Sequence, residues 1–497
     1  MGRAYLLRNK VGRKPMGRRS LIFLGKTLLM ATLLTLVFSV IYNQPIRFRS
    51  KMTAYADSVY TLYPSSSIPD QIMLSPAEDP SVAIRINWRT SPGINAGQVQ
   101  YGEFNPFGAL ERFVEPAELT VMDTPELKQD ARIHLFSAAL KGLAPGTKYQ
   151  YRVGDASAGV WSGFHTFTTA PAASEGFSFV YLGDTQNNHA EFGRLLKMVE
   201  TYNPEAAFYM VGGDLVEDGR WRYLWDSFAA NTTEVFSYKP VAPTLGNHDY
   251  KKPTDNGLKY FAGLFNLPDN GQAGLPRGSN YSFKYENVYF IVLDSNNQEI
   301  DQTEWLEGEL LKAGGSDFTV AMFHHPPYSP KGRDNAWIRE QWLPLFDKYR
   351  VDLVLNGHDH SYLRTGKVEG GRRADMSGQG TVYVVATACS KFHNMEQVGL
   401  ADKQLAETIT YQKITIGRNK ADKPVLSYQA FDAENHLVDS FTIESGRTAA
   451  GPSVRSGPAD GSGSLVLFKK TRLLSQVTQK GDQENRLGAV VSQVGHP

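Results

Sequence analysis

Five short motifs rich in aspartate, asparagine and histidine each follow a strand-like apolar run. They are GDTQ (183–186), GGDLVEDG (212–219), GNHD (246–249), HHPP (324–327) and GHDH (357–360). Carboxylate, amide carbonyl and imidazole groups are the ligands that hard and borderline cations take. Residues just past the carboxyl ends of strands in an α/β sheet meet in one crevice. The pattern therefore predicts a metal site built from Asp184, Asp214, Asn247, His324, His358 and His360.

The chemistry that such a set supports is displacement at phosphorus. A carboxylate shared by two cations, each completed by further ligands, holds a metal pair about 3.5–4 Å apart. The pair deprotonates a water at neutral pH and stabilises both the attacking and the leaving oxygen. The competing interpretation is that these are turn residues, because Asp, Asn and Gly all favour turns. Turns would account for one Gly-Asp or Gly-Asn pair, but not for three histidines in a matching series.

The elements that position these motifs are strands that alternate with helices. Apolar runs at 177–182, 206–211, 240–245, 318–323 and 351–355 precede the motifs, and 287–296, 381–388 and 424–445 supply further strands. Helical patterns occupy 189–202, 303–313 and 335–349. Asn187 and Asn188 fit either the mouth of the site or the N-cap of the first of these helices. The alternation predicts an α/β domain.

The region before this domain has a different pattern. Residues 68–170 contain short alternating runs between turn signals, including VAIRINWRT, QVQYG and TKYQYRVGD. Several short strands at regular spacing indicate a β-sandwich. TTAPAASEG (168–176) then separates the two regions as a linker.

The five motifs resemble those of the calcineurin-like metallophosphoesterase superfamily, and the sandwich resembles the fibronectin type III-like domain that precedes the catalytic domain in purple acid phosphatases. The resemblance covers roughly residues 65–446. It implies a two-domain fold, an N-terminal all-β fibronectin III-like sandwich (66–170) followed by an α/β four-layer αββα metallophosphoesterase domain (175–446).

The resemblance also implies roles for single residues. Asp184 and His360 would serve the first metal, Asp214 would bridge, and the second metal would take Asn247, His324 and His358. His248 matches the family's non-ligand histidine, which contacts the phosphate with Asn247 and can protonate the leaving oxygen. The implied cofactors are two metal ions, drawn from Fe, Mn and Zn.

Two positions depart from the family's patterns. Gln186 stands where many superfamily members have a histidine, and Glu217 where purple acid phosphatases have a tyrosine. Gln186 is either a ligand or a contact just outside the ligands. Glu217 is expected to be solvated, or to hold its turn, rather than to bind metal. His325 is either a substrate contact in the pocket wall or a packing residue.

Composition excludes other classes of function. The chain has 497 residues, 41% hydrophobic and 21% charged, with a net charge of +1. Such a balance gives no bulk basic field for nucleic acid. Cys389 is the only cysteine, so no intramolecular disulfide can form, and a small buried role is expected for it.

The two ends of the chain differ from its middle. Residues 1–20 are basic, 21–43 form an apolar run, 44–65 are a spacer, and 447–497 form a flexible tail rich in Gly, Ser and Pro. A basic segment before an apolar run predicts a retained membrane anchor with the enzyme outside the cytoplasm, periplasmic or extracellular. The alternative is a cleaved signal peptide and a secreted protein.

The leading prediction for function is hydrolysis of phosphomonoesters at a membrane-anchored, exported binuclear centre. One alternative is a phosphodiesterase acting on nucleotides or lipid headgroups, because one metal pair serves both reactions. Another is a surface binding protein on a degenerate phosphatase scaffold, which the intact set of ligand-type residues argues against. The sequence does not reveal the oligomeric state.

Overall fold

The computed structural model describes residues 60–106, 113–173, 176–250, 256–374 and 379–447. The basic segment, the proposed anchor at 21–43, most of the spacer and nearly all of the tail lie outside the described residues. Among the residues that are described, no helix combines the length and apolar character that crossing a membrane requires.

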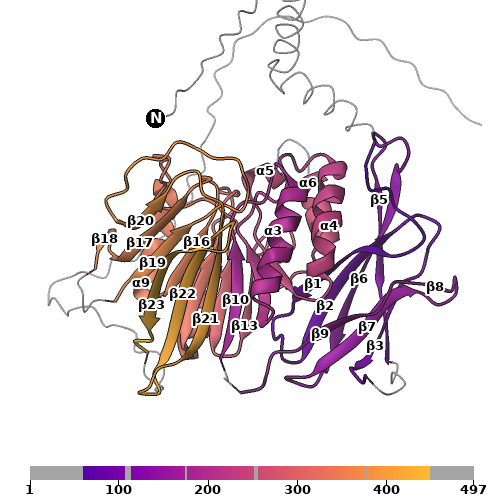
Figure 1. The fold of residues 1–497 in the computed structure, drawn as a ribbon, viewed down its shortest axis with the longest axis horizontal. Coiled ribbons are helices and arrows are strands. Elements are labelled where there is room, and N and C mark those ends of the chain that lie inside the picture. The colour runs from indigo at the N-terminus through magenta and orange to yellow at the C-terminus, as the bar shows by residue number, and fades with distance from the viewer. Residues whose placement is uncertain (1–59, 107–112, 174–175, 251–255, 375–378, 448–497) are drawn as a thin grey trace, which may run out of the picture. The chain divides into compact units, whose positions relative to one another are not determined.

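The N-terminal domain is the predicted β-sandwich, built from two antiparallel sheets (Figure 1). One sheet has the order β1 (Asp70–Pro76), β2 (Ala83–Thr90), β6 (Arg132–Lys141), β5 (Glu118–Asp123). The other contains β4 (Phe113–Pro116), β3 (Gln98–Glu103), β7 (Lys148–Asp155), β8 (Val160–Trp161) and β9 (His165–Thr168). Stacked aromatic pairs fill the space between the sheets, with Trp88 and Phe136 at a ring-centroid distance of 5.4 Å.

Two mixed sheets form the α/β domain. The first has the order β12 (Val241–Pro243), β11 (Ala206–Val211), β10 (Phe177–Leu182), β21 (Thr410–Arg418), β22 (Pro424–Asp432), β23 (Leu437–Glu444). The second has the order β13 (Tyr281–Tyr285), β14 (Val288–Val292), β15 (Phe318–Met322), β16 (Leu353–Asn356), β19 (Thr381–Val385), β17 (Tyr362–Glu369), β18 (Arg372–Arg373), and β20 (Ala401–Leu405) pairs with β17. The strands that lead to the motifs run parallel within each sheet.

The two sheets pack face to face through an aromatic core. Phe179 of β10 meets Phe290 of β14 edge-on at 5.3 Å between ring centroids, and Phe208 of β11 meets the same ring at 5.3 Å. The next residue, Tyr209, points the other way and packs on Phe236, as the alternation of side chains along a strand requires. Each sheet therefore buries one face against the other sheet and one face under helices.

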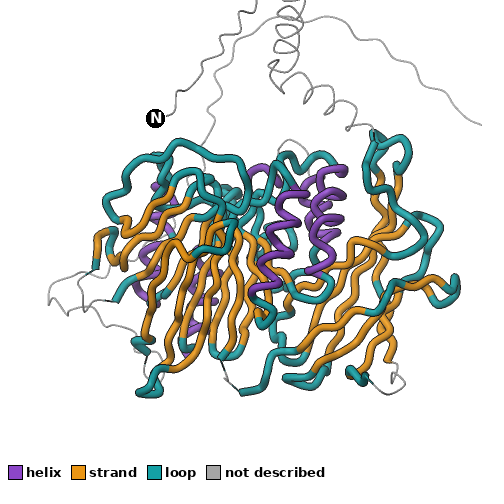
Figure 2. The backbone as a smooth tube through the Cα atoms, viewed as in Figure 1, coloured by secondary structure: helices purple, strands orange, loops and turns teal. Residues whose placement is uncertain are grey.

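Helices cover the outer faces, which confirms the αββα layers (Figure 2). The first sheet carries α3 (His189–Tyr202) and α4 (Arg222–Phe236), and the second carries α7 (Thr303–Lys312), α8 (Ala336–Gln341) and α9 (Leu343–Tyr349). Asn188 caps α3 by accepting a hydrogen bond from the Glu191 backbone N–H. The helix predicted at 335–349 is instead two helices, because Pro344 cannot continue the hydrogen-bond ladder of α8.

Buried ion pairs join the sandwich to α4. Arg89 of β2 donates to Asp226 at 2.7 Å, and Gln71 of β1 donates to the same carboxylate oxygen at 3.1 Å. Arg222 contacts Asp226 at 3.2 Å and Asp130 of the sandwich at 2.5 Å. The predicted two domains therefore share a buried polar interface.

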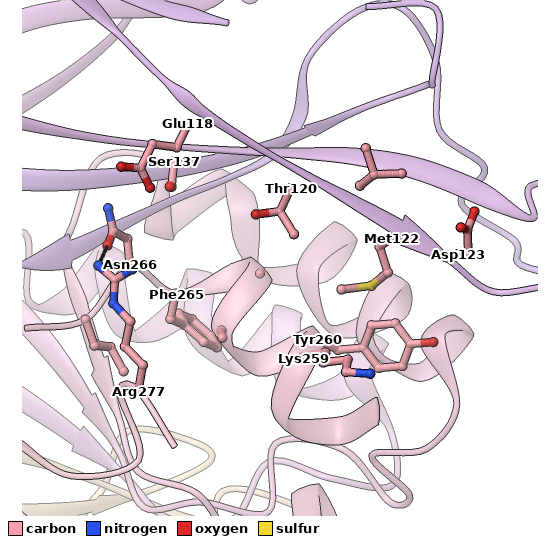
Figure 3. A pocket seen from close by; sticks show the side chains of 15 residues that line it. Glu118, Thr120, Met122, Asp123, Ser137, Lys259, Tyr260, Phe265, Asn266 and Arg277 are labelled. Atoms are coloured by element: carbon pink, nitrogen blue, oxygen red, sulfur yellow. Dashed lines mark hydrogen bonds between the residues drawn. The ribbon is translucent and has the colours of Figure 1, made fainter. Parts of the chain in front are cut away.

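A cavity of about 590 Å³ lies along the same seam, between β5 and the short helix α6 (Asn256–Leu264) (Figure 3). Met122, Tyr260 and Phe265 contribute apolar surface, and Lys259 and Arg277 contribute charge. None of its lining residues belongs to the five motifs. The cavity is therefore separate from the crevice predicted at the strand ends.

Candidate metal centre

The strand ends bring the six predicted ligands together from both sheets. Asp184 follows β10, Asp214 follows β11, and Asn247 opens the short helix α5 (Asn247–Tyr250) after β12. His324 follows β15, and His358 and His360 follow β16. Asp184 also forms an isolated parallel bridge with Thr387, just past β19 of the second sheet. The carboxyl ends of these strands, which come from both sheets, therefore meet at this point.

Three of these residues hold unusual backbone conformations. Asp214, His358 and His360 have φ angles of 48°, 75° and 49°. Non-glycine residues rarely adopt positive φ, and such strain clusters at functional sites. Glycines allow the close approach: a Cβ on Gly246 would lie 2.1 Å from Asp214 Oδ1, and a Cβ on Gly357 would lie 2.0 Å from Asp184 Oδ1.

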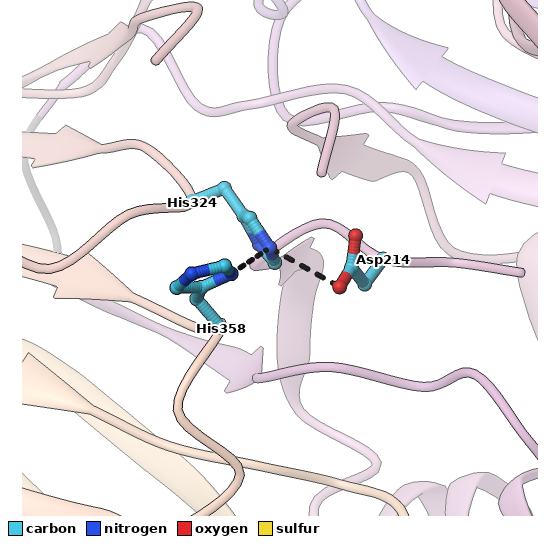
Figure 4. A group of neighbouring side chains, drawn as sticks. All are labelled: Asp214, His324 and His358. Atoms are coloured by element: carbon cyan, nitrogen blue, oxygen red, sulfur yellow. Dashed lines mark hydrogen bonds and ion pairs between the residues drawn. The ribbon is translucent and has the colours of Figure 1, made fainter. Parts of the chain in front are cut away.

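The side chains form two groups that share one carboxylate. Ligand-type atoms of Asp214, His324 and His358 lie within 4.8 Å of one another (Figure 4), and so do those of Asp184, Asp214 and His360. His324 Nε2 is 3.2 Å from Asp214 Oδ2, and His360 Nε2 is 3.1 Å from Asp184 Oδ2. A carboxylate common to two ligand groups is the arrangement that a metal pair requires.

The rings of two histidines are oriented by hydrogen bonds on their far side. His324 Nδ1 donates to the Gly212 carbonyl at 2.8 Å, and His360 Nδ1 donates to the Lys391 carbonyl at 2.7 Å. Each bond leaves Nε2 facing the carboxylates, as in most histidine metal sites.

Buried oxygens without partners provide a test of whether a cation fits. Gln186 Oε1 and Asn247 Oδ1 are buried and accept no hydrogen bond within the described residues, and the buried Asp184 Oδ2 has only the ion pair with His360 there. Leaving a buried polar atom unsatisfied is costly, so each such atom needs an explanation. All three belong to residues predicted at the site, and oxygen is a suitable ligand for the implied cations. The donor set therefore fits a pair of metal ions.

The carboxylates and histidines of the site shift one another's pKa values. Burial alone would raise the pKa of Asp214, but the His324 ring holds it below the usual aspartate range. Burial would lower the pKa of His324, but Asp214 raises it to about 9, and Asp184 overcomes burial to raise that of His360 to about 11. Burial and the neighbouring His324 lower the pKa of His358. Without metal, the positive charges of His324 and His360 thus balance the carboxylates, as metal cations would when bound.

His248 lies outside both ligand groups. Its backbone N–H donates to Asp214 Oδ1 at 2.8 Å, and its Nδ1 donates to the Glu217 carbonyl at 2.6 Å. The side chain is 20% exposed. Its Nε2 is therefore the ring atom left to meet a substrate, beside the first residue of α5, Asn247.

The three additional candidates differ in their surroundings. Gln186 is fully buried, and its amide nitrogen lies 2.9 Å from His360 Nε2, in contact with the group of Asp184, Asp214 and His360. Glu217 is 43% exposed and belongs to neither group; its carboxylate pairs with Lys391 at 3.1 Å and lies 3.7 Å from His248 Nδ1. His325 hydrogen-bonds Ser295 Oγ through Nδ1 at 2.8 Å and packs on His358 at 4.2 Å between ring centroids. Burial and His324 lower the pKa of His325 to about 3.

Some residues at the site escaped the sequence interpretation. Asp249 accepts hydrogen bonds from the backbones of Leu215, Val216 and Gly246, and so ties two motif loops together. Its position as the last residue of GNHD was an available signal. His393 packs on His360 at 4.6 Å between ring centroids, and its Nδ1 is buried with no hydrogen-bond partner in the described part of the chain. No motif marks that histidine.

Comparison with known proteins matches both domains separately. Residues 177–362 match the calcineurin-like phosphoesterase family, and residues 69–169 match the purple acid phosphatase N-terminal domain. The chain is similar to an uncharacterized protein of Mycobacterium tuberculosis, with 27% identity over 336 residues, 59% of this chain and 62% of that protein. It thus spans about three fifths of that relative's length.

Two plant proteins extend the comparison. Fe(3+)-Zn(2+) purple acid phosphatase 12 of Arabidopsis thaliana is 25% identical over 331 residues, 62% of this chain and 68% of that protein. The solved structure of a purple acid phosphatase from yellow lupin seeds shares the fold, with a TM-score of 0.63 and 18% identity over 76% of this chain and 74% of that one. The matched domains and the shared fold place the chain in the calcineurin-like metallophosphoesterase superfamily, among its purple acid phosphatase-like members.

Proposed function

We propose that this protein is a binuclear metal-dependent phosphoesterase that hydrolyses phosphomonoesters. The observation that carries the proposal is the Asp214 carboxylate, which belongs to both candidate ligand groups. A binding module on a degenerate scaffold would have no use for that arrangement. The Asn247 side-chain oxygen, buried and without a partner among the described residues, supports the same conclusion.

The chain's own residues define the parts of the reaction. Asp184, Asp214 and His360 would hold one metal ion, and Asp214, Asn247, His324 and His358 the other. Such a pair supplies an activated water and neutralises charge on the phosphoryl oxygens. Asn247 orients the phosphoryl group. His248, held through Nδ1 by the Glu217 carbonyl, presents Nε2 to the leaving oxygen and donates a proton to it.

The identity of the metals follows from the departure at position 217. One relative's name specifies Fe(3+) and Zn(2+). Here Glu217 replaces the expected tyrosine and pairs with Lys391, so no phenolate from that position stabilises a ferric ion. We therefore propose a pair of divalent ions, drawn from Fe, Mn and Zn, for this chain.

A paired assay tests the proposal. Metal-loaded protein should hydrolyse 4-nitrophenyl phosphate faster than bis(4-nitrophenyl) phosphate, with Asp214→Asn as the inactive control. Faster turnover of the diester would instead establish the phosphodiesterase alternative. If Asp214→Asn kept both its metals and its turnover, the assigned centre would be contradicted. If wild type hydrolysed neither ester, the binding-protein alternative would be favoured.

We also propose that residues 21–43 anchor the protein with its α/β domain outside the cytoplasm. The support is the basic segment that precedes this apolar run. The full-length protein should stay in the membrane fraction through salt and alkaline washes. A soluble chain beginning near Asp57 would instead establish a cleaved signal peptide.

A further inference from the structure

Two histidines of the site are oriented by main-chain carbonyls of residues that lie far apart in the sequence. His248 Nδ1 donates to the Glu217 carbonyl at 2.6 Å, and His360 Nδ1 donates to the Lys391 carbonyl at 2.7 Å. Glu217 lies in the loop between β11 and α4, and Lys391 lies in the loop between β19 and β20. Each loop therefore sets the direction of one histidine that the proposed reaction uses.

The side chains of the same two residues form an ion pair. Lys391 Nζ lies 3.1 Å from each carboxylate oxygen of Glu217. The carboxylate also approaches His248, with Oε1 at 3.7 Å from Nδ1 of the ring. The Glu217–Lys391 pair thus connects the loop that holds His248 to the loop that holds His360.

Further contacts attach each loop to its surroundings. The Gly219 N–H donates to the His248 carbonyl at 2.8 Å, so segment 217–219 holds His248 through both its ring and its main chain. In the other loop, Ser390 Oγ donates to Glu191 of α3 at 2.7 Å, one residue before Lys391. A displacement of either loop would therefore move the histidine that this loop holds.

The ion pair is too exposed to contribute much to the stability of the fold. The Lys391 and Glu217 side chains are 29% and 43% exposed, and ion pairs in contact with water stabilise a protein only weakly. Their effect on the reaction can be larger, because a displacement of about 1 Å at a reacting group can cost about a hundredfold in rate. His248 and His360 must both be placed correctly relative to one phosphoryl group, since one would act on its leaving oxygen and the other would hold a metal.

We propose that the Glu217–Lys391 pair fixes the position of the general acid His248 relative to the metal ligand His360, which makes Glu217 and Lys391 positioning residues for the reaction. This inference rests on the proposed function. Removing either charged group leaves both carbonyls in the main chain but disconnects the two loops. We therefore expect weaker binding at the metal site that contains His360 and poorer proton donation by His248, with the fold intact.

A double-mutant cycle tests whether the two side chains act as one unit. At saturating Mn²⁺, Glu217→Gln and Lys391→Gln should each lower kcat for glycerol 3-phosphate about tenfold, the lower end of the range for residues that orient metal ligands. Residues in contact have non-additive effects, so the double variant should also lose only about tenfold. A loss of about a hundredfold in the double variant would show that the side chains act independently and would overturn the proposal.

The leaving group separates the effect on His248 from a general loss of structure. Because the leaving group of 4-nitrophenyl phosphate needs no proton, each single variant should keep most of its wild-type kcat with this ester. The midpoint of urea unfolding should match that of wild type. Equal losses with both esters, or a kcat that falls together with the unfolding midpoint, would reveal a merely structural role and overturn the proposal.

A second ion pair of similar exposure provides the control. Lys413 of β21 pairs with Glu205, and their side chains are 24% and 52% exposed. Glu205 precedes β11, and the opposite end of that strand leads to Asp214. Glu205→Gln and Lys413→Gln should therefore keep wild-type kcat values and Mn²⁺ affinities. Losses as large as those at Glu217 and Lys391 would contradict a specific role for the proposed pair.

Metal binding provides a measurement that does not depend on turnover. His360 belongs to one ligand group only, so calorimetric titration with Mn²⁺ should show one of two sites weakened about tenfold in each single variant. Exchanging the charges, Glu217→Lys together with Lys391→Glu, restores the link between the loops and should recover most of that affinity.

Unchanged Mn²⁺ affinities in the single variants, or no recovery when the charges are exchanged, would overturn the proposal. If wild type hydrolysed no monoester but the Mn²⁺ affinity fell and recovered as expected, the proposed function would be rejected and the link from Glu217 through Lys391 to His360 would stand.

Discussion

Asp214 unites three functions in a single side chain. It belongs to both ligand groups, pairs with His324, and accepts the His248 backbone N–H at 2.8 Å. Asp214→Asn keeps an oxygen that can accept that backbone bond but removes the anion between two cations. We expect a folded protein with reduced metal content and little activity, measured by elemental analysis and phosphatase assay. Full metal content with near-normal turnover would refute its role as the bridge.

Metal binding should release protons. In the metal-free protein Asp214 raises the pKa of His324 to about 9 against the effect of burial, and Asp184 raises that of His360 to about 11. Both rings are then charged at pH 7, and a metal ion can bind only the neutral ring. Affinity should therefore rise from pH 6 to pH 8.

Calorimetric titration with Mn²⁺ in buffers of different ionisation enthalpy measures this release. We expect about two protons released at pH 7 when both sites fill, one from each of these rings. Heats that do not depend on the buffer would show that neither ring is protonated before metal binds.

His248 is predicted to act on the leaving oxygen. His248→Ala removes a side chain that belongs to neither ligand group, so both metals should remain. The rate should fall by roughly a hundred- to ten-thousandfold, the usual range for a lost general acid. Because 4-nitrophenolate leaves without a proton, the rate of hydrolysis of 4-nitrophenyl phosphate should fall less than that of an alkyl phosphate. Equal losses across leaving groups would exclude proton donation.

Glu217 should make the iron-loaded protein nearly colourless. In purple acid phosphatases the colour arises from a tyrosinate bound to ferric iron, and here Glu217 faces Lys391 instead. The hydroxyl of Tyr181 lies against Gly212, but burial, aided by the nearby Asp184, raises its pKa well above the usual range and opposes phenolate formation. A visible absorption spectrum of the Fe-loaded protein tests whether the protein is colourless. A purple band that Tyr181→Phe abolishes would identify an unexpected ligand.

At the level of loops, one buried carboxylate aligns two motifs. Asp249 accepts three backbone N–H groups, from Leu215, Val216 and Gly246. Asp249→Ala leaves all three donors buried without an acceptor, at about 1–3 kcal/mol each. We expect a loss of several kcal/mol in the free energy of unfolding and a larger fractional loss of activity than of metal. Asp249→Asn, which keeps acceptor capacity, should be milder, and unchanged urea unfolding of the Ala variant would contradict this role.

Many of the strands, helices α3 and α7, and the region of α8 and α9 could be predicted because each has a local signal. Helices α4, α5 and α6 were not predicted, nor were several strands, among them β13, β17 and β21. The helix at 189–202 has an apolar period and an Asn188 cap, and the structure places α3 over the same residues. Helix α4 was missed, since its N-cap Trp221 makes no side-chain hydrogen bond and residues 231–233 (NTT) favour turns or strands. Local patterns identify elements that carry their own start and stop signals.

The candidate site also has a part that the sequence predicts and a part that it does not. Each predicted ligand ends a strand within a motif, so its place could be inferred from topology. The surroundings of Glu217 depend on Lys391, 174 positions along the chain, and those of Gln186 on His360, also 174 positions away. No local pattern encodes such pairs. Asp249 lies within the GNHD motif, but its three hydrogen bonds, and the contact of His393 with His360, became visible only in the folded chain.

The two domains are joined through charges that water does not reach. Arg89, Arg222 and Asp226 are each no more than 2% exposed, and Asp226 accepts from both arginines and from Gln71. Breaking such a network is costly because the remaining charges stay buried and unpaired. The sandwich and the α/β domain should therefore unfold together.

Asp226→Ala tests this coupling. The change removes the carboxylate that the buried guanidinium groups of Arg89 and Arg222 share. We therefore expect a loss of about 3–5 kcal/mol in the free energy of unfolding. Glu234→Ala is the matched control, since it lies on the same helix in an exposed pair with Lys197 and should change stability very little. Wild type should show one thermal transition by calorimetry. Two separate transitions in wild type, or equal effects of the two variants, would show that the sandwich folds independently. The metal ligands lie outside this network, so surviving folded Asp226→Ala should still bind its metals.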